Sequence, residues 1–254
     1  MAACDSGFKM SDKLLAKDGP ATKARQRADG HLDVFGSIPE EYRPAVLEQC
    51  ARRMLRKGET IWTQGDTADY AAFLVSGAAM SIYQARNGKI GTTGFWCPGD
   101  ILGAGDIGLR TTRQMTVRCL DSCVIYTLPY TRFQHLLRRF PELADAVIRA
   151  LSLRLRWVAQ LAVMLETQLG IERICTTLLA LADRFGRVED KEVLIDLRLT
   201  NEDLAAISGL SRQFVNAALS KLRKEGVLRM QKRALVLVDS ESLARSMGWD
   251  ELDT

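Results

Sequence analysis

The stretch LTNEDLAAISGLSRQFVNAALSKLRKEG, residues 199–226, has the pattern of two short helices joined by a tight turn. Thr200 is placed to cap the first helix, and Asp203, three residues later, completes a capping box. Gly209 allows the chain to reverse sharply where this helix ends, and Ser211 is placed to cap the second helix. The stretch therefore predicts a helix-turn-helix.

The second helix is predicted to have one apolar and one polar face. Apolar residues recur in it at intervals of three and four and are expected to face inward: Phe214, Val215, Ala218, Leu219 and Leu222. On the polar face, Arg212 suits the edge of guanine and Gln213 that of adenine in the major groove of DNA. We therefore expect DNA contacts from Thr200, Ser211, Arg212, Gln213, Asn216, Ala217, Ser220 and Lys221.

Two short β-rich runs follow this helix, Val227–Arg229 and Leu235–Val238, with a basic turn between them. They predict a wing, with Lys232 and Arg233 near DNA phosphates. Residues 199–234 include seven basic and three acidic residues, so this stretch carries +4, which equals the net charge of the whole chain. This concentration of positive charge favours a nucleic-acid partner over the alternative, a purely structural helix pair.

The composition is that of an ordinary folded protein: 254 residues, 47% hydrophobic and 26% charged, long enough for two domains. No apolar run matches a signal peptide or a membrane span, so we expect a cytoplasmic protein without a membrane partner. The six cysteines are scattered, which is typical of reduced thiols. Residues 1–34 are polar and are expected to form a flexible N-terminal arm.

Residues 35–140 predict a β-rich domain that begins with a short helix near Tyr42–Cys50. Short apolar runs alternate with turn sequences, among them Asn87-Gly88, which predicts a two-residue hairpin. Many short strands at close spacing favour a small antiparallel β-roll, or jelly roll. The expected strands are Ile61–Thr63, Ala71–Val75, Ala79–Tyr83, Ile90–Trp96, Ile101–Leu102, Met115–Leu120 and Cys123–Leu128.

Residues 141–169 predict one long helix, because neither proline nor glycine interrupts the chain between Pro141 and Gly170. Its apolar residues follow a heptad spacing, which lets two helices wrap around each other, so we expect a homodimer. The alternative is that this stripe packs against the roll of its own chain. The expected dimer interface consists of Ile148, Leu151, Leu155, Val158, Ala162, Leu165 and Leu169.

Gly170 is expected to be the hinge between two domains, and a second amphipathic helix follows it. The predicted fold class is therefore α+β, in four parts. These are the arm (1–34), an effector-sensing roll (35–140), a dimerisation helix (141–169) and a winged helix-turn-helix DNA-binding domain (170–254).

In this order of parts the chain resembles the Crp/Fnr superfamily of bacterial transcription regulators, over about residues 35–239. The resemblance implies a homodimer that binds partly palindromic double-stranded DNA and contacts RNA polymerase, with a roll of the cyclic-nucleotide-binding type that senses a signal. It rests on Gly58-Glu59, Gln64-Gly65-Asp66, Phe73-Leu74-Val75-Ser76-Gly77, Pro98-Gly99-Asp100, Leu102-Gly103 and Arg113 in the roll, and on Leu204-Ala205, Gly209-Leu210-Ser211-Arg212, Val215 and Leu222.

The roll departs from members of that family that bind cyclic AMP. Those members carry Gly-Glu, Arg-Ser and Thr-Ser where this chain has Gly103-Ala104, Arg113-Gln114 and Val158-Ala159. The missing carboxylate and hydroxyls would leave a buried polar nucleotide without partners, so we expect a signal other than cyclic AMP. We place the effector pocket at Gly103, Ala104, Arg113, Gln114, Leu155, Val158 and Ala159.

The sequence leaves two interpretations open for Arg113, and two for the tryptophans near this pocket. The planar guanidinium of Arg113 suits a carboxylate or phosphate, such as that of a small organic acid, or else it forms an internal ion pair. Trp62, Trp96 and Trp157 are either cavity walls or ordinary core residues.

No cofactor, metal or enzymatic activity is expected. An iron–sulfur cluster needs several converging cysteines, and only Cys4 precedes Cys50. Haem needs an axial ligand, and of the two histidines one lies in the arm (His31) and the other in an expected solvated helix (His135). The chain shows no metal-ligand spacing, phosphate-binding loop or catalytic constellation.

The primary hypothesis is a signal-responsive, sequence-specific DNA-binding regulator. One alternative is a sensor or scaffold whose helix-turn-helix does not read DNA, and another is a redox-responsive regulator acting through Cys119 and Cys123. Gln213 and Ala217 stand where many family members have Glu and Arg, so the target sequence is expected to differ.

Overall fold

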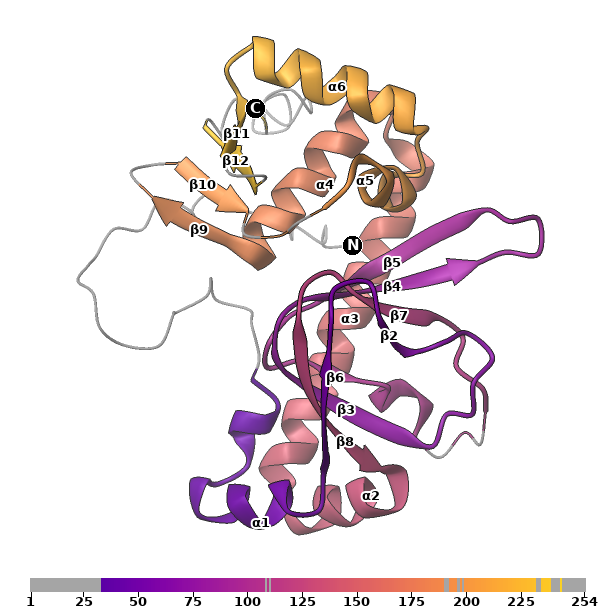
Figure 1. Ribbon diagram of the computed structural model, residues 1–254, viewed down its shortest axis with the longest axis vertical. Coiled ribbons are helices and arrows are strands. Elements are labelled where there is room, and N and C mark those ends of the chain that lie inside the picture. Colours follow the sequence, from indigo (N-terminus) through magenta and orange to yellow (C-terminus); the bar gives the residue numbers. More distant parts are fainter. Residues whose placement is uncertain are drawn as a thin grey trace, which may run out of the picture.

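The computed structural model describes residues 33–107, 109, 111–189, 192–195, 197, 199–231, 234–238 and 243. They form an N-terminal β-roll, a long helix and a C-terminal helix-turn-helix domain (Figure 1). The expected α+β architecture is therefore confirmed. The arm predicted at residues 1–34 lies outside the described residues, apart from its last two.

Two antiparallel four-stranded sheets make up the roll, in the orders β1-β8-β3-β6 and β2-β7-β4-β5. All seven predicted strands are present within one or two residues. The additional strand, β1, was not predicted because its sequence ARRML does not alternate between apolar and polar residues, and only Leu55 in it is buried. The strands are β1 (Ala51–Leu55), β2 (Thr60–Trp62), β3 (Tyr70–Ser76), β4 (Ala79–Gln84), β5 (Ile90–Trp96), β6 (Ile101–Leu102), β7 (Thr116–Cys119) and β8 (Cys123–Pro129).

Strands β4 and β5 form the hairpin predicted at Asn87-Gly88. Its connection is longer than the two residues expected, because Ala85 N–H donates to Lys89 O and Gly88 N–H donates to Ala85 O, each at 2.9 Å. Gly88 has φ +79°, a conformation that favours glycine. Strand β5 lies against helix α5 of the C-terminal domain (Figure 1).

Within the described part of the chain, four α-helices precede the helix-turn-helix: α1 (Arg43–Leu47), α2 (Tyr130–Arg139), α3 (Pro141–Thr167) and α4 (Gly170–Phe185). Helix α3 runs along the roll and reaches the C-terminal domain (Figure 1). The prediction that it continues to Leu169 was wrong: Gln168 and Leu169 are extended, so Leu169 precedes α4 instead of continuing the dimer stripe. Among the described residues, no helix combines the length and apolar character needed to cross a membrane.

The C-terminal domain contains the predicted helix-turn-helix and wing. Thr200 Oγ1 accepts the Asp203 N–H at 3.1 Å, and Ser211 Oγ accepts the Phe214 N–H at 3.1 Å, so both predicted caps form. Gly209 has φ +65° at the turn between the helices. Helices α5 (Asn201–Ser208) and α6 (Arg212–Lys224) are followed by β11 (Leu228–Gln231) and β12 (Ala234–Leu237), which pair with β10 (Glu192–Ile195) and β9 (Gly186–Glu189) in the order β11-β12-β10-β9.

The roll and the C-terminal domain share an apolar core. The ring of Phe95 in β5 meets that of Phe185 in α4 edge to face, with centroids 6.0 Å apart. Beside this contact, Arg118 Nη2 of β7 donates to Asp203 Oδ1 of α5 at 2.6 Å. Asp203 therefore takes part in the cap of α5 and also links this helix to the roll through its ion pair with Arg118.

Candidate DNA interface and effector cavity

The start of α6 presents the predicted polar face to solvent. Arg212, Gln213, Asn216 and Ala217 are exposed, whereas Ser220 is half-buried. Asn216 Oδ1 accepts a hydrogen bond from Asn201 of α5. Arg212 forms no hydrogen bond or ion pair with any described residue, so its guanidinium is free to contact a partner. Thr200, Ser211 and Lys221 are also exposed.

The opposite face of α6 is buried as predicted, except at its beginning. Val215, Ala218, Leu219 and Leu222 are all buried. Phe214 is 41% exposed, and the expectation that it packs inward was wrong. Its ring lies against Gly170 at the α3–α4 junction, where a Cβ would sit 2.7 Å from the ring.

Part of the positive charge around the wing is paired. Lys221 forms an i,i+4 ion pair with Glu225 at 3.8 Å, and Arg229 of β11 pairs with Glu192 of β10. Lys232 and Arg233, predicted at the tip of the wing, lie outside the described residues.

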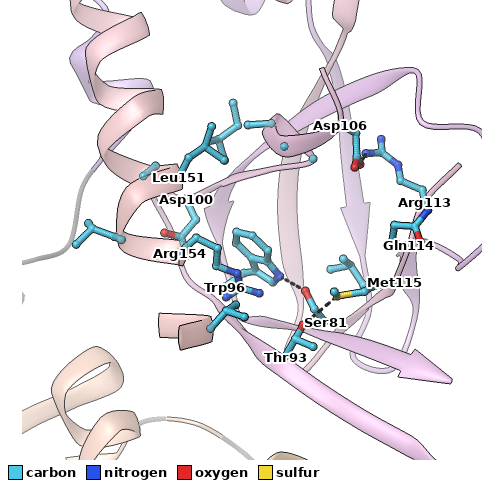
Figure 2. A pocket seen from close by; sticks show the side chains of 18 of the residues that line it. Ser81, Thr93, Trp96, Asp100, Asp106, Arg113, Gln114, Met115, Leu151 and Arg154 are labelled. Atoms are coloured by element: carbon cyan, nitrogen blue, oxygen red, sulfur yellow. Dashed lines mark hydrogen bonds and ion pairs between the residues drawn. The ribbon is translucent and has the colours of Figure 1, made fainter. Parts of the chain in front are cut away.

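A cavity of about 290 Å³ lies between the roll and α3 (Figure 2). Leu155 and Ala159, predicted for the pocket, do not line it, because their side of α3 faces away from the roll: Leu155 is 71% exposed. Trp157 is absent from the lining as well, and its indole N–H donates to Thr93 O at 2.9 Å. Of the predicted residues, Gly103, Ala104, Arg113, Gln114 and Val158 line the cavity, as do Trp62 and Trp96.

Arg113 forms the internal ion pair that the sequence left open as one interpretation. Its side chain is 1% exposed, and its Nη1 lies 2.8 Å from both Asp106 Oδ2 and the Tyr130 hydroxyl. Its Nη2 donates to Tyr70 O, and its guanidinium stacks 3.8 Å from the centre of the Trp62 ring. Both terminal nitrogens of Arg113, which could otherwise bind a ligand's phosphate, therefore already have hydrogen-bond partners within the protein.

Two further arginines line the cavity, and sequence reasoning missed both. Arg154 of α3 stacks 4.1 Å from the centre of the Trp96 ring. Arg184 of α4 forms an ion pair with Asp100, which follows β5 in the Pro98-Gly99-Asp100 motif. Figure 2 shows Arg154, Trp96 and Asp100 at one end of the cavity and Arg113 with Asp106 at the other. The only signal in the sequence was an arginine between the apolar positions of α3.

The predicted redox pair is buried. Cys119 and Cys123 are each 1% exposed, and their thiols form a hydrogen bond. That hydrogen bond and burial raise the pKa of Cys119, whereas the same hydrogen bond lowers the pKa of Cys123. Among the described residues, no group of three or more His, Cys, Asp or Glu is placed to hold a metal.

The predicted dimer stripe of α3 is exposed in the single chain. Leu155 is 71% exposed and Ile148 60%. Leu151, Val158, Ala162 and Leu165 are exposed as well, so the stripe does not pack on the chain's own roll over most of its length. This argues against the alternative that the sequence left open.

Comparison with known proteins matches both domains. A cyclic nucleotide-binding domain model matches residues 52–140, and a Crp-like helix-turn-helix domain model matches residues 172–246. The chain is 26% identical over 197 residues to the transcriptional activator protein FnrA of Stutzerimonas stutzeri, covering 77% of this chain and 80% of that protein. It is 28% identical over 216 residues to the CRP-like cAMP-activated global transcriptional regulator of Mycobacterium tuberculosis, covering 84% and 95% respectively.

Solved structures share the fold. The c-di-GMP responsive global regulator CLP of Xanthomonas campestris matches with a TM-score of 0.68 at 23% identity, over 80% of this chain and 99% of that one. A CooA mutant of Carboxydothermus hydrogenoformans matches with a TM-score of 0.71 at 20% identity, over 85% and 96%. Both family models match in the order in which the fold places their domains, and the chain therefore belongs to the Crp/Fnr family of transcription regulators.

Proposed function

We propose that this regulator acts as a homodimer that reads a partly palindromic DNA site through α6, under the control of a signal received in the roll cavity. The observation that carries the DNA-reading part is the exposed polar face at the N-terminal end of α6. Arg212 there has no partner among the described residues, and a recognition helix enters the major groove with this end first. Arg212, Gln213, Asn216 and Ala217 are the proposed reading residues.

The homodimer is supported by the exposed stripe on α3. A monomer rarely leaves a continuous apolar stripe of this length in water, and the heptad spacing suits a second copy of the same helix. A two-fold pair of α3 helices also suits the DNA, because it places two α6 helices one helical turn apart, about 34 Å. Contact with RNA polymerase is proposed from family membership.

The signal is proposed to be other than cyclic AMP, although the relative from Mycobacterium tuberculosis is named as cAMP-activated. Ala104 lines the cavity where cyclic-AMP-binding members carry a carboxylate. Val158 and Ala159 bring no hydroxyl from α3. Arg113 is engaged by Asp106. A polar nucleotide would lose its hydrogen bonds to water without gaining replacements.

The DNA-reading role is tested by selecting preferred sites from random duplexes and measuring affinity by fluorescence anisotropy. Arg212→Ala should weaken binding to the selected site by about 1–3 kcal/mol, roughly 5- to 150-fold, and leave random DNA nearly unchanged. Arg56→Ala, which removes an exposed arginine on the roll, is the matched control. Equal losses on selected and random duplexes for Arg212→Ala would contradict the proposed role.

A further inference from the structure

One end of the roll cavity carries a positive charge that no described residue neutralises. Arg154 and Arg184 both reach this end, and Asp100 is the carboxylate beside them. Asp100 forms its ion pair with Arg184. Arg154 forms no hydrogen bond or ion pair with any described residue. Two guanidinium groups therefore share one carboxylate, and a single positive charge remains.

The side chain of Arg154 is fixed in position by its neighbours. Its guanidinium lies over the ring of Trp96, whose indole N–H donates to Ser81 Oγ at 2.6 Å and so fixes the ring. It also lies against Gly94, where any side chain would overlap with it. Burial and the neighbouring Arg184 lower the pKa of Arg154 to about 10, so the side chain stays protonated at neutral pH. A half-buried charge beside another guanidinium, with the nearby carboxylate of Asp100 already paired to Arg184, is poorly compensated, and a bound anion would relieve this cost.

The rest of the cavity limits the size and character of such an anion. At the far end Arg113 is already paired with Asp106, so the positive charge without an ion pair among the described residues lies at the Arg154 end. Its walls between the two ends include the apolar side chains of Trp62, Trp96, Ile101, Leu151 and Val158. A volume of about 290 Å³ lies at the lower end of known ligand pockets, which excludes a dinucleotide.

We propose that the cavity binds a small monocarboxylate with an apolar body, its carboxylate on Arg154 and its body along Trp96 and the apolar wall. This inference rests on the proposed function, because it names the class of signal that the roll receives. It moves the anion site from Arg113, where the sequence placed it, to the opposite end of the cavity. A phosphate dianion fits less well, because its second charge would have no partner among these apolar walls.

The test uses the full-length protein at pH 7.5 and isothermal titration with phenylacetate and hexanoate as probes. Phenylacetamide, hexanamide and inorganic phosphate serve as comparison ligands. We expect at least one carboxylate to bind at least tenfold more tightly than its amide and than phosphate. Arg154→Met should lose at least tenfold in that affinity, whereas Arg156→Met, an exposed arginine on the same helix, should keep it.

A thermal melt shows whether Arg154→Met is folded, and we expect it to melt no lower than the wild type because it loses an unpaired charge. The inference is overturned if neither carboxylate binds, if the amides or phosphate bind as tightly, or if Arg154→Met binds like Arg156→Met. DNA takes no part in this titration. A protein that binds the carboxylate but shows no preference among duplexes would contradict the proposed function and leave this inference intact.

Discussion

Replacing Gly103 with alanine tests how far the Arg113 network stabilises the roll. Gly103 has φ +77°, a conformation that costs alanine about 1–2 kcal/mol. Its new Cβ would lie 2.5 Å from Arg113 Nη1 and 3.2 Å from Tyr70 O, so the guanidinium has to move away from Asp106 and Tyr130. Breaking a buried ion pair costs about 3–5 kcal/mol. Asp106 keeps 23% exposure, which favours the lower end of that range. The free energy of unfolding should therefore fall by about 4–5 kcal/mol.

Gly105→Ala is the matched control, two residues away in the same short turn. A Cβ at Gly105 would meet no atom within 4 Å, and its φ lies outside the left-handed region. Its free energy of unfolding should change by no more than about 0.5 kcal/mol. The assay is a urea titration followed by tryptophan fluorescence, because Trp62 stacks 3.8 Å from the Arg113 guanidinium and reports on its displacement.

A double variant separates two costs of the Gly103→Ala change: the steric clash of the new methyl group with Arg113, and the strain of alanine at a positive φ. If the guanidinium is what the new methyl group displaces, Gly103→Ala combined with Arg113→Met should cost less than the two single changes together. A loss below about 1 kcal/mol for Gly103→Ala, or strictly additive losses in the double variant, would refute the reasoning.

Three further predictions follow from the α3 stripe, the domain contact and a buried thiol. Leu155→Glu should convert the proposed dimer into monomers in analytical ultracentrifugation, because it would place two carboxylates across the α3 seam; an unchanged dimer would contradict the proposed interface. Arg118→Met should lower stability by less than about 1 kcal/mol, because Arg118 is 40% exposed, yet speed hydrogen exchange in α5 by freeing Asp203 from the roll. Burial raises the pKa of Cys175 from 9.0 to about 11, so at pH 8 its thiolate fraction is about a hundredth of an ordinary thiol's, and iodoacetamide should label it only near pH 11 or after unfolding. Rapid labelling at pH 8 in the folded protein, read by peptide mass spectrometry, would contradict this.

Local chemistry explains why the helix-turn-helix was predictable. The caps at Thr200 and Ser211 and the left-handed turn at Gly209 each depend on neighbours within four residues. Seven of the roll's eight strands were predictable for the same reason, since each of the seven is an apolar run between turns. Strand β1 was missed because this mostly exposed edge strand shows no alternation of apolar and polar residues, and its pairing with β8 joins residues about seventy positions apart.

The contacts that join the domains were not predictable. Asp203 reads in the sequence as a helix cap, and nothing local indicates that Arg118, eighty-five residues earlier, donates to the same carboxylate. The lining of the cavity was not predictable for the same reason, because its residues come from distant parts of the sequence. Arg113 was found through a motif, whereas Arg154 and Arg184 become cavity residues only once α3 and α4 are placed against the roll.

The two ends of α4 explain how an anion in the cavity would affect the reading helix. Near its start, Arg173 donates to Leu165 O of α3 at 2.7 Å, which fixes α4 to the long helix. Near its end, Arg184 pairs with Asp100 of the roll while facing the positive charge of Arg154. A carboxylate bound to Arg154 would offset that repulsion and so favour the Arg184–Asp100 ion pair, which joins the roll to α4, the helix that leads into the DNA-binding domain. Because binding free energies are coupled reciprocally, saturating operator DNA must change the affinity for the carboxylate by the factor with which the carboxylate changes operator affinity.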